Sequence, residues 1–134
     1  SIFDRTIEQN GLKAEAVNLK KGIIAFSPLA QGMLTDRYLN GVPEGSRIKT
    51  DGRFLKESAL TDEKLEKIRG LSKIAARRGQ TLAEMALAWI LKDSAVTSVL
   101  IGASKPSQIL DNIKALDNTS FSAEELEEIN RLSI

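Results

Sequence analysis

The sequence contains neither cysteine nor histidine among its 134 residues. The lack of cysteine excludes a disulfide framework and thiolate chemistry. The lack of histidine removes the commonest general base and the commonest metal ligand. No apolar run approaches the roughly 20 residues that a membrane-spanning helix needs, and no signal peptide is recognisable. We therefore expect a cytoplasmic protein with no membrane insertion and no metal site.

Charge is nearly balanced, with a formal net charge of +1 at pH 7. Nothing in this balance predicts binding to nucleic acid. Hydrophobic residues make up 42% and charged residues 28% of the chain, a composition typical of globular proteins. A length of 134 residues corresponds to one ordinary domain.

The stretch from Gly22 to Leu34, in the first third of the chain, is the most informative part of the sequence and predicts a strand followed by a loop. Its apolar run Ile23–Phe26 is typical of a short strand buried on both faces, as in parallel sheets. Pro28 cannot donate to a strand ladder, so we expect a loop to begin there. The carboxyl ends of parallel strands carry the ligands in α/β folds. The alternative is a core strand followed by an ordinary turn.

The remaining elements alternate between helices and a second short strand. Capping signals at Thr61, Thr81 and Ser122 predict three helices, and Trp89 is expected to anchor the core of the second. The other predicted elements are a helix over Leu12–Lys20 that Gly22 ends, a buried strand over Val99–Ile101, and a helix opened by Ser104 with the inner stripe Ile109, Leu110, Ile113 and Leu116. This alternation indicates right-handed βα units of a parallel sheet.

The second predicted strand is followed by a Gly, a Ser and the start of a helix. Gly102 and Ser104 precede a helix with Pro106 in its first turn. Free backbone N–H groups and the helix dipole make such a start suitable for an anion. A phosphate-bearing ligand is the expected occupant.

The run Phe26-Ser27-Pro28-Leu29-Ala30-Gln31-Gly32-Met33-Leu34-Thr35 resembles the loop after the seventh barrel strand of the aldo-keto reductase family. The branch it resembles contains bacterial glyceraldehyde-phosphate reductases and the β subunits of voltage-gated potassium channels. In that family this loop wraps the pyrophosphate and adenosine half of NADP(H). The resemblance thus implies cofactor contacts from Phe26, Ser27, Pro28, Leu29, Ala30, Gln31 and Gly32.

Two further groups of cofactor residues follow from the same resemblance. Arg37 and Arg47 match basic residues that reach the phosphates from a loop folding over the cofactor, although both could instead be surface charges. The second group matches residues around the 2′-phosphate, ribose and adenine, and comprises Gly102, Ser104, Lys105, Gln108, Asp111 and Asn112. Family members commonly carry Glu at the position of Asp111. Lys105, beside the expected 2′-phosphate, favours NADP(H) over NAD(H).

The resemblance implies an α/β fold, namely the C-terminal portion of a (β/α)8 TIM barrel. It runs from the end of strand 6 through helix 8, so the barrel is incomplete. Ser1–Arg5 resembles the segment after the tyrosine that stacks on the nicotinamide ring. Residues 1–134 would form part of a single barrel domain and contain much of the NADP(H)-binding site.

The family's reaction moves a hydride from NADPH to an aldehyde or ketone. A tyrosine protonates the oxygen, supported by an aspartate, a lysine and usually a histidine, all from the first half of the barrel. The only tyrosine here, Tyr38, matches none of these, so we carry over no catalytic residue and expect the chain alone to be inactive. Two alternatives stay open, a non-catalytic interaction protein resembling a channel β subunit and a natural half-barrel. The expected partner is a small carbonyl substrate, and a homo-oligomer is possible.

Overall fold

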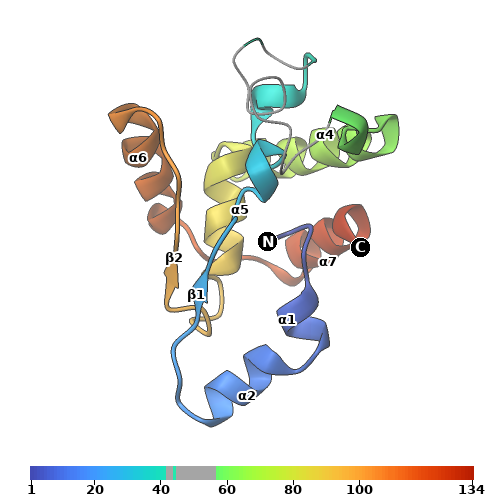
Figure 1. Ribbon diagram of the computed structural model, residues 1–134. Coiled ribbons are helices and arrows are strands. Elements are labelled where there is room, and N and C mark those ends of the chain that lie inside the picture. The colour runs from blue at the N-terminus through green and yellow to red at the C-terminus, as the bar shows by residue number, and fades with distance from the viewer. Residues whose placement is uncertain (42–43, 45–56) are drawn as a thin grey trace.

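The computed structural model describes residues 1–41, 44 and 57–134. Arg47, one of the predicted cofactor residues, lies outside the described residues. With the labels of Figure 1, the helices and strands are α1 (Thr6–Gln9), α2 (Leu12–Asn18), β1 (Ile24–Ala25), α4 (Asp62–Arg77), α5 (Leu82–Ile90), β2 (Ser98–Val99), α6 (Pro106–Ile113) and α7 (Ala123–Ser133). Short 3₁₀ helices are η1 (Ala30–Gly32), η2 (Asp36–Tyr38), η3 (Glu57–Ala59) and η4 (Lys114–Asp117). None of the described helices is long and apolar enough to cross a bilayer.

Helix α5 lies at the centre of the molecule (Figure 1). It packs against α4 on one side and against α6 and η4 on the other, while α4 also contacts α7. The main core joins Ile68, Leu71 and Ile74 of α4 to Met85 and Trp89 of α5. Such burial is the dominant stabilising contribution in a fold of this size. The prediction that Trp89 anchors the core is confirmed, because only 4% of it is exposed.

Three helix starts were predicted from capping signals, and all three are confirmed. The Thr61 hydroxyl accepts the Lys64 N–H, and Thr81 and Ser122 each form a reciprocal capping box. In the box of α5, Thr81 Oγ1 accepts the Glu84 N–H at 3.2 Å and Glu84 Oε2 accepts the Thr81 N–H at 3.1 Å. These bonds satisfy N–H groups that no helical carbonyl can reach.

The predicted end of α2 is wrong. The helix stops at Asn18, and Lys20 rather than Gly22 adopts the left-handed backbone, with φ 55°. Lys20 N donates to Val17 O at 3.1 Å and Lys21 N to Ala16 O at 2.8 Å. These two bonds pair carbonyls at the helix end and offset the roughly 1–2 kcal/mol that a left-handed non-glycine residue costs. Gly22 instead allows close approach, since a Cβ there would lie 2.9 Å from Thr97 Oγ1.

The two strands are parallel neighbours, with Ile24 opposite Ser98 and Ala25 opposite Val99. They are shorter than predicted, and β2 ends before Leu100. Burial of the Ile23–Phe26 strand on both faces is also wrong, because Ile24 is 65% and Phe26 78% exposed. Burial on both faces requires a layer on each side of the sheet. In the described part of the chain, the core covers only the face that carries Ile23, Ala25 and Val99.

The prediction that α6 has a buried inner stripe is also wrong. Ile109, Leu110, Ile113 and Leu116 are all exposed, and no residue of α6 is buried. The helix does have a strongly one-sided apolar pattern, but α5 and η4 contact only part of its surface. Periodicity shows that a face is apolar; whether another element covers it depends on packing that periodicity does not encode.

We expect the two strands to be the weakest part of a chain of these 134 residues prepared alone. A two-stranded sheet is marginal in water, and uncovered strand edges recruit other chains. The ladder amides of Thr97 and Leu100 should exchange hydrogen at least about 100-fold faster than amides in α4 and α5. Light scattering of the same samples should show self-association. A monomer with strongly protected Thr97 and Leu100 amides would contradict this expectation.

Candidate cofactor site

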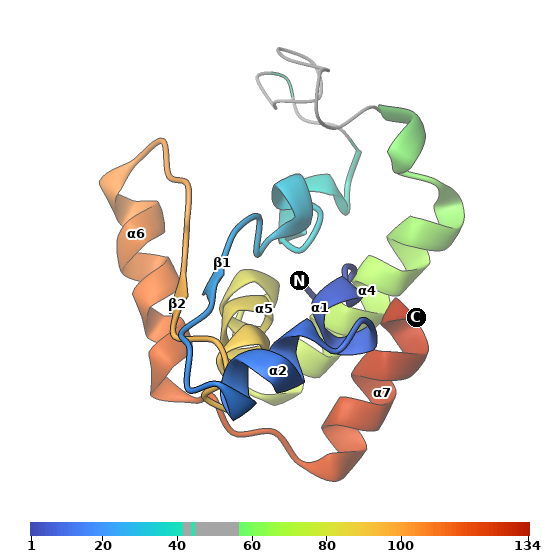
Figure 2. The same ribbon diagram turned by 60° about the horizontal axis from the view of Figure 1, so that its bottom comes forward.

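The parallel pair places the starts of two predicted ligand loops side by side. Leu100 N donates to Ala25 O at 2.8 Å, so the chain leaves β1 and β2 from the same edge. Figure 2 shows both segments running toward the same side of the molecule, one into η1 and η2 and the other into α6. This edge is where parallel α/β folds hold ligands.

The loop after β1 has an unusual backbone. Ser27, Ala30 and Gln31 have φ values of 50°, 49° and 61°, and they are three of the five non-glycine residues with positive φ among the described residues. Gly32 continues the run with φ 89°. Each non-glycine residue in this region costs about 1–2 kcal/mol, and such strain is concentrated at functional sites. Gly32 N and Leu34 N both donate to Leu29 O, at 3.0 and 3.1 Å, which holds the loop closed.

The predicted loop residues differ in their exposure. Pro28 is buried, whereas Leu29, Ala30, Gln31 and Gly32 are half-buried. Phe26 and Ser27 are exposed at the edge of the pair. The loop is therefore partly accessible at this edge, and a ligand could contact it there.

Arg37 lies in η2 directly after this loop, and its side chain is exposed. Among the described residues, no hydrogen bond or ion pair engages its guanidinium. Both neighbours in sequence are fixed: Ser72 Oγ of α4 donates to Asp36 Oδ1 at 3.2 Å, and Tyr38 is buried against Met33 and Leu60. Because its guanidinium is unpaired among the described residues and its backbone is fixed, Arg37 could donate two parallel N–H bonds to a phosphate.

The second predicted group lies at the start of α6. The helix begins one residue later than predicted, with Lys105 rather than Ser104 at the N-cap. The side-chain oxygen of Gln108 accepts three bonds there, from Ser104 N at 2.7 Å, Ser104 Oγ at 3.2 Å and Lys105 N at 3.2 Å. These are donors of the kind that a helix start offers to an anion. Gln108 therefore has to release them before a phosphate can take them.

The remaining residues of this group are Asp111 and Asn112 on α6 and Gly102 before it. Asp111 Oδ1 accepts from Lys114 Nζ at 3.0 Å on an exposed flank. That hydrogen bond, together with the charge of Asp111, raises the pKa of Lys114 above its ordinary value. Asn112 is half-buried, and a Cβ at Gly102 would meet no atom within 4 Å. The structure thus places Asp111 and Asn112 on α6 and Gly102 ahead of it, and no hydrogen bond or ion pair among the described residues joins them to the β1 loop.

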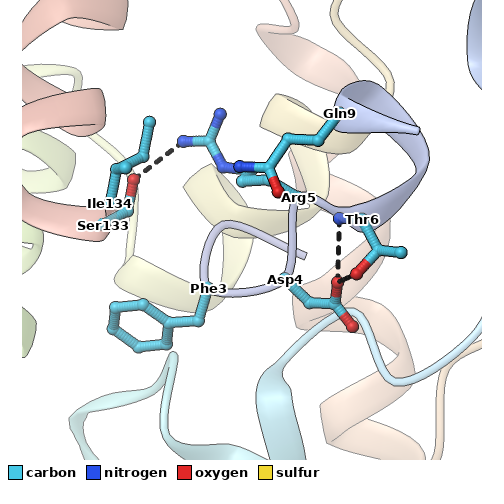
Figure 3. Close-up of a pocket in the computed structure, with 7 residues that line it drawn as sticks. All are labelled: Phe3, Asp4, Arg5, Thr6, Gln9, Ser133 and Ile134. Atoms are coloured by element: carbon cyan, nitrogen blue, oxygen red, sulfur yellow. Dashed lines mark hydrogen bonds between the residues drawn. The ribbon is translucent and has the colours of Figure 1, made fainter. Parts of the chain in front are cut away.

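Two surface pockets lie away from the predicted residues. One, of about 380 Å³, lies between the N-terminal turn and the end of α7 (Figure 3). Several of its polar groups already have partners: Asp4 Oδ1 accepts from Thr6, and Arg5 Nη2 donates to Ser133 Oγ at 2.8 Å. The other, of about 640 Å³, lies at the start of α5, where Arg78 Nη1 donates to Glu125 Oε2 at 2.8 Å. Neither pocket includes a predicted cofactor residue.

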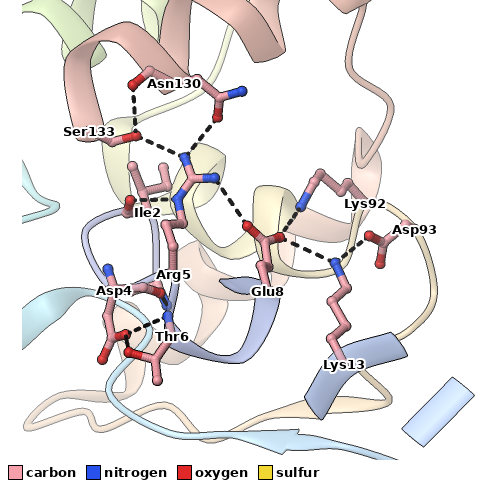
Figure 4. Close-up of polar contacts among 11 residues, drawn as sticks. Ile2, Asp4, Arg5, Thr6, Glu8, Lys13, Lys92, Asp93, Asn130 and Ser133 are labelled. Carbon is pink, nitrogen blue, oxygen red and sulfur yellow. Dashed lines mark hydrogen bonds and ion pairs between the residues drawn. The ribbon is translucent and has the colours of Figure 1, made fainter. Parts of the chain in front are cut away.

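A cluster of charged residues beside the first pocket ties distant segments together (Figure 4). Glu8 pairs with Arg5, Lys13 and Lys92, and Lys13 also pairs with Asp93. Partial burial alone would raise the pKa of Glu8, but Lys92, Arg5 and Lys13 outweigh it and lower that pKa below its ordinary value. Each of the three cations is already paired with Glu8 or Asp93, so we assign the cluster a structural role.

Sequence reasoning missed two residues that support the β1 loop, Thr35 and Tyr38. The Thr35 hydroxyl caps η2 by accepting the Arg37 N–H. A threonine directly before Asp36-Arg37 is a recognisable capping signal. Tyr38 was considered only as a candidate acid, and its burial beneath the loop has no signal in local sequence.

The family model of the aldo/keto reductases matches residues 1–134, which is the whole chain. The chain belongs to the aldo/keto reductase family. It is 46% identical over 134 residues to an L-glyceraldehyde 3-phosphate reductase of Escherichia coli K12, covering 98% of this chain and 39% of that protein. A Schizosaccharomyces pombe protein named as a voltage-gated potassium channel β subunit is 43% identical over 99 residues, 72% of this chain and 29% of the other.

Solved structures of the family share the fold. The glycerol dehydrogenase AKR11B4 of Gluconobacter oxydans matches with a TM-score of 0.76 and 25% identity, over 98% of this chain and 39% of that one. The holo form of the aldo-keto reductase AKR11C1 of Bacillus halodurans matches with a TM-score of 0.72 and 27% identity, over 100% and 40%. The chain thus spans about two fifths of the length of these family members.

Proposed function

We propose that this chain is the C-terminal part of an aldo/keto reductase barrel and supplies the NADP(H)-binding part of a carbonyl reductase. The observation that carries the proposal is the strained loop after β1, closed on Leu29 O and followed by Arg37, whose guanidinium is unpaired among the described residues. The start of α6, at the same edge of the strand pair, would receive a second anionic group. The complete protein would reduce aldehydes or ketones to alcohols.

The described residues fit the chemistry of a dinucleotide phosphate. The loop from Ser27 to Gly32 and the side chain of Arg37 would hold the pyrophosphate, and Ser104 with Lys105 the 2′-phosphate. Asp111 and Asn112 would face the ribose and adenine, with Gln108 moving away from the helix start. Arg47 belongs to the same proposal through the resemblance alone. The bound cofactor would supply the hydride, while the acid that protonates the substrate oxygen would come from outside this chain.

A second candidate function is that of a partner protein that keeps the cofactor site without catalysis. The observation in its favour is the 43% identity to the Schizosaccharomyces pombe protein named as a channel β subunit. The two candidates predict the same cofactor site and differ in the first half of the barrel. A complete Tyr, Asp, Lys and His set in the full-length protein favours the reductase, and a degraded set favours the partner protein.

Replacement of Arg37 by Ala should weaken NADPH binding to the complete protein by about 1.5–3 kcal/mol, since a charged hydrogen bond to phosphate is lost. This corresponds to a Kd roughly 10- to 100-fold higher. Fluorescence titration with NADPH would measure it. Arg131→Ala is the matched control, because Arg131 is exposed on α7, away from the proposed site.

The two variants separate a local role from a general charge effect. Arg131→Ala should bind NADPH as the unchanged protein does. An unaltered Kd in Arg37→Ala would remove Arg37 from the site, and equal weakening in both variants would indicate only a nonspecific attraction of the polyanion.

A further inference from the structure

Thr35 connects the strained loop to the residue that follows it. Its hydroxyl donates to Gly32 O at 2.6 Å and accepts from Arg37 N at 3.2 Å. One half-buried side chain therefore uses both its donor and its acceptor capacity, and each bond reaches a different part of the proposed phosphate site. The bond to Gly32 falls on the last residue of the positive-φ run.

The segment that Thr35 caps is also held from two other directions. Ser72 of α4 anchors Asp36 through a hydrogen bond of 3.2 Å. Tyr38, only 1% exposed, packs directly beneath the loop, since a Cβ at Gly32 would lie 3.5 Å from Tyr38 Cε2. The Tyr38 hydroxyl has no hydrogen-bond partner among the described residues, so the ring supports the loop by packing.

We infer that Thr35 is a positioning residue for the cofactor: its hydroxyl fixes the Ser27–Gly32 loop and the Arg37 backbone in one arrangement that receives the pyrophosphate. This inference rests on the proposed function. Strained backbone relaxes unless its surroundings hold it, and a site held in advance loses less freedom on binding. Thr35 itself need not touch the ligand.

Three variants separate the hydrogen bonds of the Thr35 hydroxyl from the shape of its side chain. Thr35→Val keeps the shape but removes both hydrogen bonds, leaving Gly32 O and Arg37 N without this partner. Thr35→Ser keeps the hydroxyl and loses only a methyl group. Ser72→Ala releases the same segment from α4 without changing Thr35, and serves as a second route to the same effect.

The complete protein should be titrated with NADPH, NADH and 2′-AMP, by fluorescence or calorimetry. In Thr35→Val we expect the Kd of NADPH and of NADH to rise together, by about tenfold, as loss of two hydrogen bonds predicts. The Kd of 2′-AMP should be unchanged, because that probe lacks the pyrophosphate and its remaining groups are assigned to Ser104 and Lys105 and to Asp111 and Asn112 of α6. Thr35→Ser should stay within about twofold of the unchanged protein, and Ser72→Ala should show the same pattern at about two- to threefold.

Other outcomes overturn the inference in distinguishable ways. Unchanged NADPH binding in Thr35→Val and Ser72→Ala would refute the positioning role and leave the proposed function standing. Equal loss of NADPH and 2′-AMP in both variants would show general damage to the fold instead of positioning. Failure of the unchanged protein to bind NADPH at all would refute the proposed function and this inference with it.

Discussion

Assayed alone with NADPH and small aldehydes, the 134-residue chain is expected to show no turnover, whereas the proposed complete protein is expected to reduce the same aldehydes. General acid catalysis contributes about 10²- to 10⁴-fold, and the acid that the family uses is expected outside this chain. The chain has no histidine. Its one tyrosine, Tyr38, is 1% exposed beneath the β1 loop, so its hydroxyl cannot reach a substrate oxygen.

The assay follows NADPH oxidation by absorbance, with equal molar amounts of the chain and of the complete protein. Heat-inactivated complete protein gives the background rate. Tyr38→Phe in the complete protein is a further control, and it should reduce aldehydes as the unchanged protein does. Turnover by the chain comparable to that of the complete protein would contradict the account.

Replacement of Trp89 by Ala should lower the free energy of unfolding by about 3–5 kcal/mol, a large effect for a domain of this size. Trp89 is 4% exposed and belongs to the main core. The Arg5 guanidinium lies 4.2 Å and the Lys92 ammonium 3.7 Å from the centroid of its ring. The variant would lose buried area, leave a cavity and remove two cation–π contacts.

Urea unfolding followed by circular dichroism would measure this loss. Leu116→Ala is the control, because 63% of Leu116 is exposed, and its effect should stay within about 0.5 kcal/mol. Comparable losses in the two variants would show that Trp89 does not hold the core together.

The local signals of the sequence predicted helix starts well. Thr61, Thr81 and Ser122 cap their helices because a hydroxyl and the N–H three residues later always meet in this geometry. Gly79 follows the end of α4 with φ 69°, a backbone conformation that favours glycine. The end of α2 was mispredicted because glycine is the residue type usually expected to adopt the left-handed conformation at a helix end, which pointed to Gly22. Lys20 adopts that conformation instead, and two hydrogen bonds offset its cost.

Burial of the strands and of α6 could not be predicted in the same way. The apolar runs at Ile23–Phe26 and along α6 show which residues can be buried, but the covering layer comes from elements far away in sequence. At the proposed site, the resemblance predicted the loop and Arg37, and the strand register brings that loop beside the start of the segment leading to α6. The bond from the Thr35 hydroxyl to Gly32 O and the cap formed by Gln108 depend on side-chain geometry that no pattern in the sequence specifies.

Hydrogen exchange of the complete protein, measured with and without NADPH, tests the central proposal most directly. We expect added NADPH to slow exchange in two separate segments, residues 27–37 and residues 104–112, and to leave residues 124–131 of α7 unchanged. Protection confined to other parts of the protein, with both segments unaffected, would contradict the assignment of this chain as the NADP(H)-binding part of the barrel.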